Sequence, residues 1–253
     1  MRYTVLTYIF NGYEKVHEIG EKDPDAEYIL VTDDPSLTSS TWDVVHDSSL
    51  DGLTPFDKCY QVRFHPFRYA NTNIVVRVDG SIIVNRPLSA VVDEFERGKY
   101  DRCLMIHPSR NTMPAEYHKW VEARNYPRAQ ANKCLAMMLN EGYDMTFRGM
   151  YQGCFEIVRD NKANTDLNDD TYALLVRLGS EDGIERIDQT ILSFLVNTRH
   201  KRMKVLTVSE HIVKSSLMTW CRHGSSVPLP PNPGMIEPYF RDALVNPYMI
   251  DEQ

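Results

Sequence analysis

Residues 73–84 read Asn-Ile-Val-Val-Arg-Val-Asp-Gly-Ser-Ile-Ile-Val, an apolar run that contains one arginine and one aspartate. Side chains alternate between the two faces of a strand, so Arg77 and Asp79 share one face while Val76 and Val78 share the other. Open α/β sheets bind their ligands at the carboxyl ends of their strands. We therefore expect Asp79, at the end of this strand, to meet a ligand.

The same residues allow a second interpretation. Asp-Gly is a favoured pair in the tight turns of β-hairpins, so Asp79-Gly80 can join residues 75–78 to residues 82–84. In the first interpretation, Gly80 instead lets the backbone turn and approach a ligand closely. The sequence alone leaves both open.

The composition is that of an ordinary globular protein. The chain has 253 residues, 42% hydrophobic and 25% charged, with a formal net charge of -7. This length suits either one large domain or a domain with an appendage. The negative charge argues against a nucleic-acid surface built on bulk positive charge. There is no apolar run of membrane-spanning length, so we expect no membrane span. The first residues lack the pattern of a signal peptide, which predicts a cytoplasmic protein.

The five cysteines are widely spaced and include no Cys-x-x-Cys pair. An odd number at such spacings predicts reduced cysteines in the core or in helices, and neither a disulfide framework nor a zinc site. They are Cys59, Cys103, Cys134, Cys154 and Cys221.

Strand and helix signals alternate along the chain, which is typical of a mostly parallel sheet with crossover helices. Residues 1–208 are expected to form this α/β domain. Residues 209–253, which include a proline-rich stretch at 228–233, are expected to form an arm that packs on the domain or is partly disordered. The predicted strands are 3–10, 27–32, 42–46, 73–78, 102–106, 154–159 and 202–208. The predicted helices are 55–65, 87–97, 113–142 with a break at Pro127, 167–178 and 188–198.

Several short motifs follow one another along the chain. They are the 5–10 strand, Lys58, Val76-Arg77-Val78-Asp79-Gly80, Ile106-His107-Pro108-Ser109-Arg110, Tyr151-Gln152-Gly153-Cys154-Phe155-Glu156 and Arg186-Ile187-Asp188-Gln189. Their order is similar to that in nucleotide-sugar glycosyltransferases of the GT-A fold. More narrowly, it resembles the glycosyltransferase-like family long described as a domain of unknown function and typified by plant wall-related proteins. The resemblance covers residues 3–208 and implies a Rossmann-like fold with a mixed, mostly parallel sheet flanked by helices.

The resemblance implies a divalent metal, Mn²⁺ or Mg²⁺, held by an Asp-x-Asp motif. Asp79 matches the first aspartate, but Ser81 stands at the second position and is a weaker ligand for a hard cation. Asp79 can otherwise bind through water or accept a hydrogen bond from a ribose or sugar hydroxyl. His223 is similar to a late histidine ligand of some such enzymes, with His211 behind it; a surface histidine in a mobile arm is the alternative.

The resemblance also implies catalytic carboxylates. Asp188 is similar to the aspartate of an Arg-Asp-Gln motif, although Ile187 is inserted here, and it is our candidate for the general base of an inverting reaction. A helix N-cap is the alternative for Asp188. Glu156 is similar to a Gly-x-x-Glu position near the acceptor, and otherwise a solvent-side strand residue.

Cationic side chains are expected near the diphosphate, because negative charge develops there when the glycosyl bond breaks. Lys58 and Arg77 are the main candidates. Arg77 needs a partner inside an apolar strand, either an internal carboxylate or a phosphate. Arg63 and Arg68 are further candidates, with an exposed helix face as the alternative.

The remaining expected donor contacts lie at strand ends and in motif loops. Aromatic residues beside Asn11 can frame a nucleotide base, although core packing predicts the same pattern. His107 is expected to bind, with a structural histidine as the alternative. These contacts are Tyr8, Phe10, Asn11, Ser81, His107, Gln152, Gly153 and Gln189, with Tyr13 nearby.

These observations predict a glycosyltransferase that moves a sugar from a nucleotide-sugar donor to a glycan or another small hydroxyl acceptor. The alternative is a degenerate GT-A domain that binds sugar nucleotides or glycans without transfer. The chain has no Gly-rich phosphate loop and no Gly-x-Ser-x-Gly elbow, which argues against dehydrogenases, ATPases and serine hydrolases. A sugar-nucleotide pyrophosphorylase is disfavoured because its early Gly-rich loop is missing.

Overall fold

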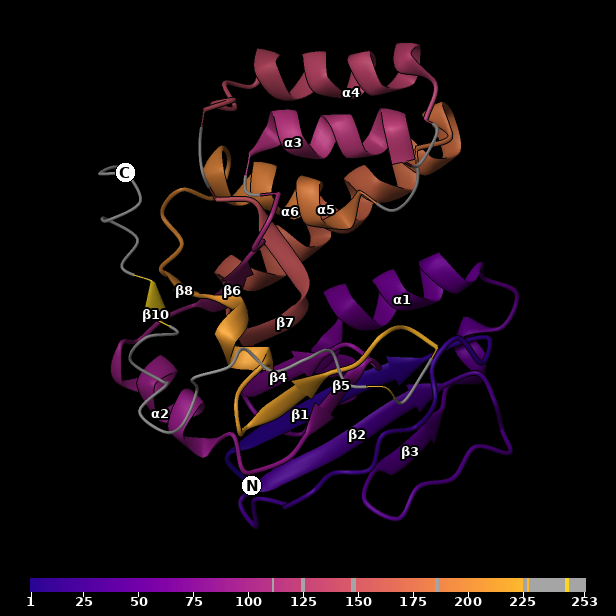
Figure 1. Ribbon diagram of the computed structural model, residues 1–253, viewed down its shortest axis with the longest axis vertical. Helices are drawn as coiled ribbons and strands as arrows, with labels where there is room; N and C mark the ends of the chain where they lie inside the picture. Colours follow the sequence, from indigo (N-terminus) through magenta and orange to yellow (C-terminus); the bar gives the residue numbers. More distant parts are fainter. Residues whose placement is uncertain are drawn as a thin grey trace.

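The fold, taken from a computed structural model, is an α/β domain around a mixed, mostly parallel sheet (Figure 1). The structure describes residues 1–110, 112–123, 126–146, 149–184, 187–224, 227 and 244–245. In this part of the chain the central sheet has the order β10-β8-β6-β7-β4-β1-β2-β3. Its strands are β1 Tyr3–Ile9, β2 Ala26–Thr32, β3 Asp43–His46, β4 Ile74–Val78, β6 Arg102–Ile106, β7 Tyr151–Arg159, β8 Val205–Val208 and β10 Leu244–Val245.

The predicted strands are confirmed, with bounds that shift by a few residues. Strands β1, β2, β3 and β4 pair in parallel, as do β6 and β8. Strand β7 runs antiparallel to both β4 and β6. The reversal brings the first residues of β7 to the edge where β4 ends, and the backbone N–H of Asp79 donates to the Cys154 carbonyl at 2.9 Å.

The hairpin interpretation of Asp79-Gly80 is wrong. Strand β5, Ile82–Val84, leaves the central sheet and pairs instead with β9, Met218–Trp220, in a separate two-stranded sheet. Gly80 does not have the positive φ that a type I′ turn needs. Its small size matters instead, because a Cβ there would lie 3.2 Å from Ile9 and 3.3 Å from Glu14.

Helices cover both faces of the sheet (Figure 1). Thr54 accepts a hydrogen bond from the Asp57 amide and Pro55 occupies the first turn of α1, as predicted from the sequence. The expected break at Pro127 separates α3 from α4. The helices are α1 Pro55–Phe64, α2 Ser89–Arg97, α3 Met113–His118, α4 Arg128–Asn140, α5 Lys162–Asp182 and α6 Asp188–Asn197, with a π-helical turn at Lys119–Ala123 and short 3-10 turns at Ser48–Leu50, Pro66–Arg68 and Glu210–Val213.

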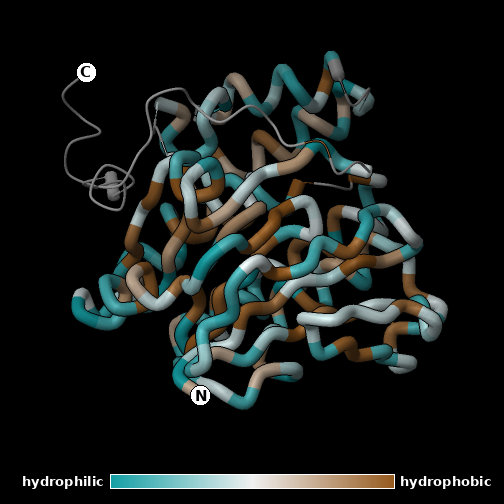
Figure 2. Tube along the Cα trace, turned by 60° about the horizontal axis from the view of Figure 1, so that its bottom comes forward, coloured by the Kyte–Doolittle hydropathy of each residue, from teal (hydrophilic) through white to brown (hydrophobic). Residues whose placement is uncertain are grey.

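The strand alternation predicted for residues 74–79 is confirmed by the packing. Val76 and Val78 pack in a core with α2 and the two-stranded sheet. Val75 faces the other way, toward Val62 of α1. Figure 2 shows the hydrophobic segments concentrated in the central strands. Arg77 therefore enters the layer between the sheet and α1.

The first part of the expected arm packs on the domain through β9 and the 3-10 turn at Glu210–Val213. The proline-rich stretch at 228–233 lies outside the described residues.

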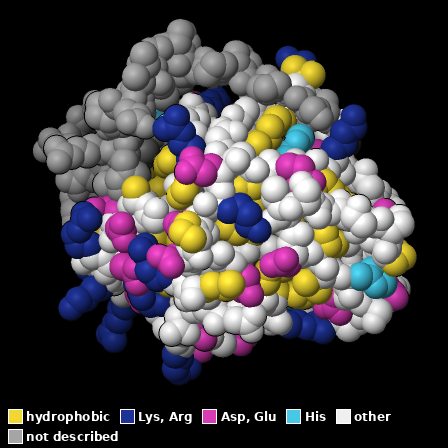
Figure 3. Space-filling model, turned by 90° about the horizontal axis from the view of Figure 1, so that it is seen from below, with side chains coloured by type: hydrophobic (Ala, Val, Ile, Leu, Met, Phe, Trp, Pro, Cys, Tyr) yellow, Lys and Arg dark blue, Asp and Glu magenta, His cyan; other side chains and the backbone are white. Residues whose placement is uncertain are grey.

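In the described part of the chain, no helix is long and apolar enough to cross a membrane. All five cysteines are free thiols, as predicted. Figure 3 shows basic and acidic side chains interspersed on one face.

Candidate active site

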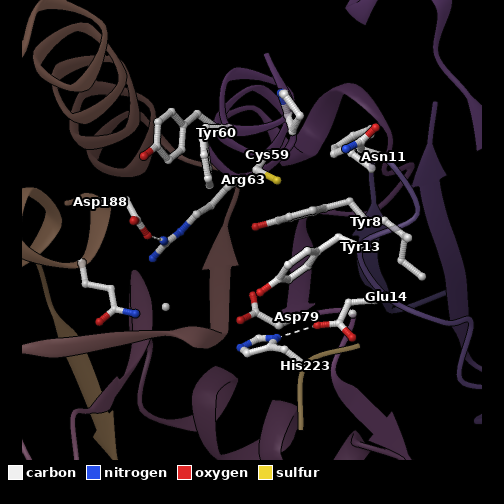
Figure 4. A pocket seen from close by; sticks show the side chains of 17 residues that line it. Tyr8, Asn11, Tyr13, Glu14, Cys59, Tyr60, Arg63, Asp79, Asp188 and His223 are labelled. Carbon is white, nitrogen blue, oxygen red and sulfur yellow. Dashed lines mark hydrogen bonds and ion pairs between the residues drawn. The ribbon is translucent and has the colours of Figure 1, made fainter. Parts of the chain in front are cut away.

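A cavity of about 570 Å³ lies where β1 and β4 end and β7 and α6 begin (Figure 4). This is the edge of the sheet at which open α/β folds bind ligands. The sequence singled out many of its lining residues, drawn from segments far apart in the chain. They include Tyr8, Phe10, Asn11, Tyr13, Arg63, Asp79, Gly153, Asp188, Gln189 and His223.

Asp79 lies in the wall of the cavity, with 30% of its side chain exposed. Its Oδ1 accepts a hydrogen bond from Nη1 of Arg77 at 2.8 Å. Arg77 is only 1% exposed and its Nη2 also donates to Glu156 Oε1 at 2.9 Å. The partners of Arg77 are thus internal carboxylates, one of the two alternatives that its position in an apolar strand allowed.

Glu156 has no exposed surface and lies beneath the cavity, where Arg63, Arg77 and Arg102 converge on its two carboxylate oxygens. We call Glu156 and these three arginines the buried charge layer. Burial alone would raise the pKa of Glu156, but the three guanidinium groups hold this pKa well below its ordinary value. A carboxylate this enclosed does not reach a ligand, so the geometry replaces its expected catalytic role with a positioning role.

Asp188 lies on the opposite side of the cavity from Asn11 (Figure 4). It is the first residue of α6 and Ile187 is the N-cap, so the N-cap alternative for Asp188 is wrong. Its carboxylate, 22% exposed, pairs with Nη1 of Arg63. The exposed-face alternative for Arg63 is also wrong, because this side chain is 4% exposed and lines the cavity.

Gly153 makes room for Arg63. A Cβ at this position would lie 2.6 Å from Nη1 and 2.8 Å from Nη2 of Arg63, so the Arg63 guanidinium would have to shift to admit a larger residue. The Gly153 carbonyl also accepts a hydrogen bond from Arg77. The arginines of the buried charge layer thus approach the backbone of Gly153 closely.

The carboxyl end of β1 forms the aromatic side of the cavity. Tyr8 and Phe10 stack with ring centroids 5.9 Å apart, and the Tyr8 hydroxyl points into the cavity (Figure 4).

Lys58 does not line the cavity. Its Nζ donates a hydrogen bond to Asp33 at 2.8 Å, and the backbone N–H of Asn11 donates to the same carboxylate at 2.9 Å. Lys58 and Asp33 therefore fix the turn that carries Asn11, whose φ of 55° is left-handed.

The rim of the cavity, formed by Tyr13, Glu14 and His223, joins the loop after β1 to the segment after β9. His223 Nδ1 lies 2.5 Å from Glu14 Oε1, and the Gly224 amide donates to Glu14 Oε2 at 2.8 Å. Tyr13 is 61% exposed, and its ring lies 5.7 Å from the His223 ring. His223 is thus held by a partner 209 residues away in sequence.

No group of three or more His, Cys, Asp or Glu side chains in a metal-binding arrangement occurs in the part of the chain that the structure describes. Asp79 and His223, the two predicted metal ligands, both line the cavity. His211 lies in the 3-10 turn at Glu210–Val213 and does not line it.

Four other predicted side chains lie elsewhere. Ser81 and Gln152 are buried and do not line the cavity. Arg68 donates to Ser49 and pairs with Asp47 on the surface.

His107 is buried, and its Nδ1 accepts a hydrogen bond from the backbone N–H of Arg110 at 3.0 Å. Burial, together with the Arg110 charge, lowers the pKa of His107 to about 4. This environment favours the structural alternative for His107. Arg186 lies outside the described residues.

Helix α1 supplies cavity residues that the sequence reasoning missed, among them Phe56, Cys59 and Tyr60. Together with Arg63, a predicted candidate, they line one side at the spacing of a single helix face. That spacing is the signal that would have found them. Burial raises the pKa of the Cys59 thiol to about 12, so it is a neutral lining group. Glu14 lies in a loop and has no comparable signal.

No model of a known protein family matches the sequence, and no curated protein matches it either. The site is therefore interpreted from its own geometry.

Proposed function

We propose that this protein is a GT-A-type glycosyltransferase that uses a nucleotide-sugar donor and a glycan or other hydroxyl acceptor. One observation carries the proposal. A single cavity at the carboxyl edge of the parallel strands places an aromatic pair, Tyr8 and Phe10, on one side of Asp79 and a second carboxylate, Asp188, on the other. A base, a sugar diphosphate and an acceptor hydroxyl need these three environments in this order.

The donor is proposed to lie with its base near Tyr8, Phe10 and Asn11, and with its ribose, diphosphate or sugar near Asp79. Aromatic rings and a backbone turn suit a planar base, whereas an exposed carboxylate accepts hydrogen bonds from hydroxyl groups. The position of Asp79 directly after β4 supports this assignment.

The charge of the lining supports a metal-assisted reaction. Among the described lining residues, Glu14, Asp79 and Asp188 are acidic, whereas Arg63 is the one permanent cation. An anionic diphosphate therefore needs additional positive charge. Mg²⁺ is commonly held by one or two carboxylates together with substrate phosphates, so Asp79 would fit such a role without a cluster of three protein ligands. Bound Mn²⁺ or Mg²⁺ would neutralise the charge that develops on the leaving diphosphate.

Asp188 is the proposed general base in an inverting reaction. Its partly exposed carboxylate can accept the proton of the acceptor hydroxyl as that oxygen bonds to the anomeric carbon and the bond to the diphosphate breaks. Arg63 holds Asp188 in place, and Glu156 in turn holds Arg63. Gln189 is adjacent, and its buried Oε1 has no hydrogen-bond partner among the described residues.

Thermal unfolding with UDP-, GDP-, CMP- and dTDP-sugars, each with Mn²⁺ and with EDTA, tests the donor assignment. A ligand that binds only the folded state raises the apparent stability, by about 2.7 kcal/mol at one hundred times its Kd. We expect one nucleotide class to raise the Tm more with Mn²⁺ than with EDTA, and Asp79→Asn to remove most of that rise. Glu122→Gln, which removes an exposed carboxylate away from the cavity, is the control. Unchanged donor binding and turnover in Asp79→Asn would refute the site.

A binding module without transfer is the second candidate. Asp79 already pairs with Arg77 and Ser81 is buried, so the Asp-x-Asp pattern presents one carboxylate to the cavity. Donor binding that is independent of metal, with neither donor hydrolysis nor transfer, would favour this module.

A further inference from the structure

A second cavity of about 240 Å³ lies between α1 and α5. It shares Phe56 and Tyr60 with the first cavity, so the same two aromatic side chains line both hollows. The helices are joined here by a hydrogen bond of 2.6 Å from Gln61 Nε2 to the Tyr172 hydroxyl. The hollow is therefore bounded by two packed helices.

The lining of the second cavity mixes apolar surface with a few polar groups. Aromatic and aliphatic side chains dominate, and the polar groups come from the first turn of α1 and the last turn of α5. This mixture suits a sugar ring, which has an apolar face and a hydroxyl-bearing edge. The lining residues are Thr54, Phe56, Asp57, Tyr60, Leu175, Val176, Gly179, Ser180 and Ile184.

Gly179 keeps the second cavity open. It lies within the long helix α5, where glycine is a poor helix former. It does not have a positive φ, and no atom lies within 4 Å of the position that its Cβ would take. Neither backbone conformation nor close packing requires a glycine, whereas a side chain at this position would occupy the hollow.

We infer that the second cavity is the acceptor subsite of the enzyme and that it takes a glycan. The reacting sugar lies in the first cavity, with its hydroxyl at Asp188, and the next ring passes Phe56 and Tyr60 into the hollow beside Gly179. This inference rests on the proposed function, because it assigns the acceptor for the same site. It commits the acceptor to at least two linked rings.

Binding of p-nitrophenyl glycosides tests the subsite, because the aryl ring takes the place of the second sugar ring. Saturation-transfer NMR and calorimetry on the whole protein would compare a panel of hexose and pentose p-nitrophenyl glycosides with the matching methyl glycosides. We expect the aryl glycosides to bind about tenfold more tightly. Gly179→Trp, which fills the hollow, should abolish that difference, whereas Gly179→Ala should preserve it.

The donor-induced rise in Tm shows whether Gly179→Trp leaves the first cavity intact. A variant that keeps this rise and loses the aryl preference supports the subsite. In another outcome, no donor raises the Tm of the wild-type protein, but the wild type prefers aryl glycosides and Gly179→Trp does not. The proposed transferase function then fails, while the carbohydrate subsite stands. The subsite is overturned if no aryl glycoside binds, if aryl and methyl glycosides bind alike, or if Gly179→Trp binds as the wild type does.

Discussion

The buried charge layer and the rim both border the same cavity, but they are built differently. In the layer, Arg77, Arg102 and Glu156 are at most 1% exposed, and every carboxylate oxygen of Glu156 has a guanidinium partner. At the rim, the His223 side chain is 54% exposed and pairs with Glu14. Charges removed from water interact strongly, whereas exposed pairs are weakened by solvent and salt.

The contrast shows which part of the site is preorganised. Arg63 and Arg77 link Glu156 to Asp188 and Asp79, so a buried anion sets the positions of two carboxylates on the cavity surface. The rim adds exposed groups that can rearrange around a ligand at small cost. Three experiments test this difference, from the largest expected effect on stability to the smallest.

Replacing Glu156 with glutamine should have the largest effect. Three buried guanidinium groups would lose their counter-ion, and breaking a buried ion pair costs about 3–5 kcal/mol. Because the folded-state pKa of Glu156 lies below its unfolded value, this contribution is present at neutral pH and is lost as the pH falls below about 4. Urea unfolding of both proteins across this pH range measures the difference.

The control for Glu156→Gln is Glu122→Gln, which removes a charge from an exposed pair with Arg128. It should change the free energy of unfolding by less than about 1 kcal/mol. Equal effects of the two substitutions would show that the buried charge layer is not a special source of stability.

Gly153→Ala should have an intermediate effect. The new methyl group would overlap the guanidinium of Arg63, which two carboxylates hold in place, and such overpacking costs about 1–3 kcal/mol. Displaced Arg63 should also weaken ligand binding, measured by calorimetry. Gly179→Ala is the matched control, since it adds the same methyl group in open space. A Gly153→Ala protein as stable as the control would contradict the assigned packing.

A double-mutant cycle on Glu14 and His223 should give the smallest effect. We expect the two alanine substitutions to couple by less than about 1 kcal/mol in thermal or urea unfolding, because the imidazole is largely exposed. Added salt should reduce the coupling further. A coupling as large as the effect of Glu156→Gln would remove the distinction between the rim and the buried charge layer.

The sequence predicted the strands and several site residues because these follow from local patterns. The apolar run at 74–78 fixed both the strand and the shared face of Arg77 and Asp79, and Thr54-Pro55 fixed the start of α1. The function of Glu156 did not follow. Strand alternation gives the face on which a side chain lies, but not that arginines from α1, β4 and β6 meet there.

The rim and the two-stranded sheet were unpredictable for a related reason. The contact between Glu14 and His223, and the pairing of Ile82–Val84 with Met218–Trp220, join segments that no spacing rule connects. Arg63 was assigned an exposed alternative from residue statistics, whereas its partners lie on β7 and α6. Tertiary contacts of this kind decide the chemistry of the cavity after local patterns have decided the strands.

The pairing of β5 with β9 also has a consequence for the order of folding. Strands β1 to β4 are made early in synthesis, but β9 and His223 are made much later. Closing a long chain segment costs entropy before its contacts form, so late, long-range pairings are slow steps. We therefore expect strands β1 to β4 to pair before the rim forms, so that the cavity is completed as one of the last events of folding.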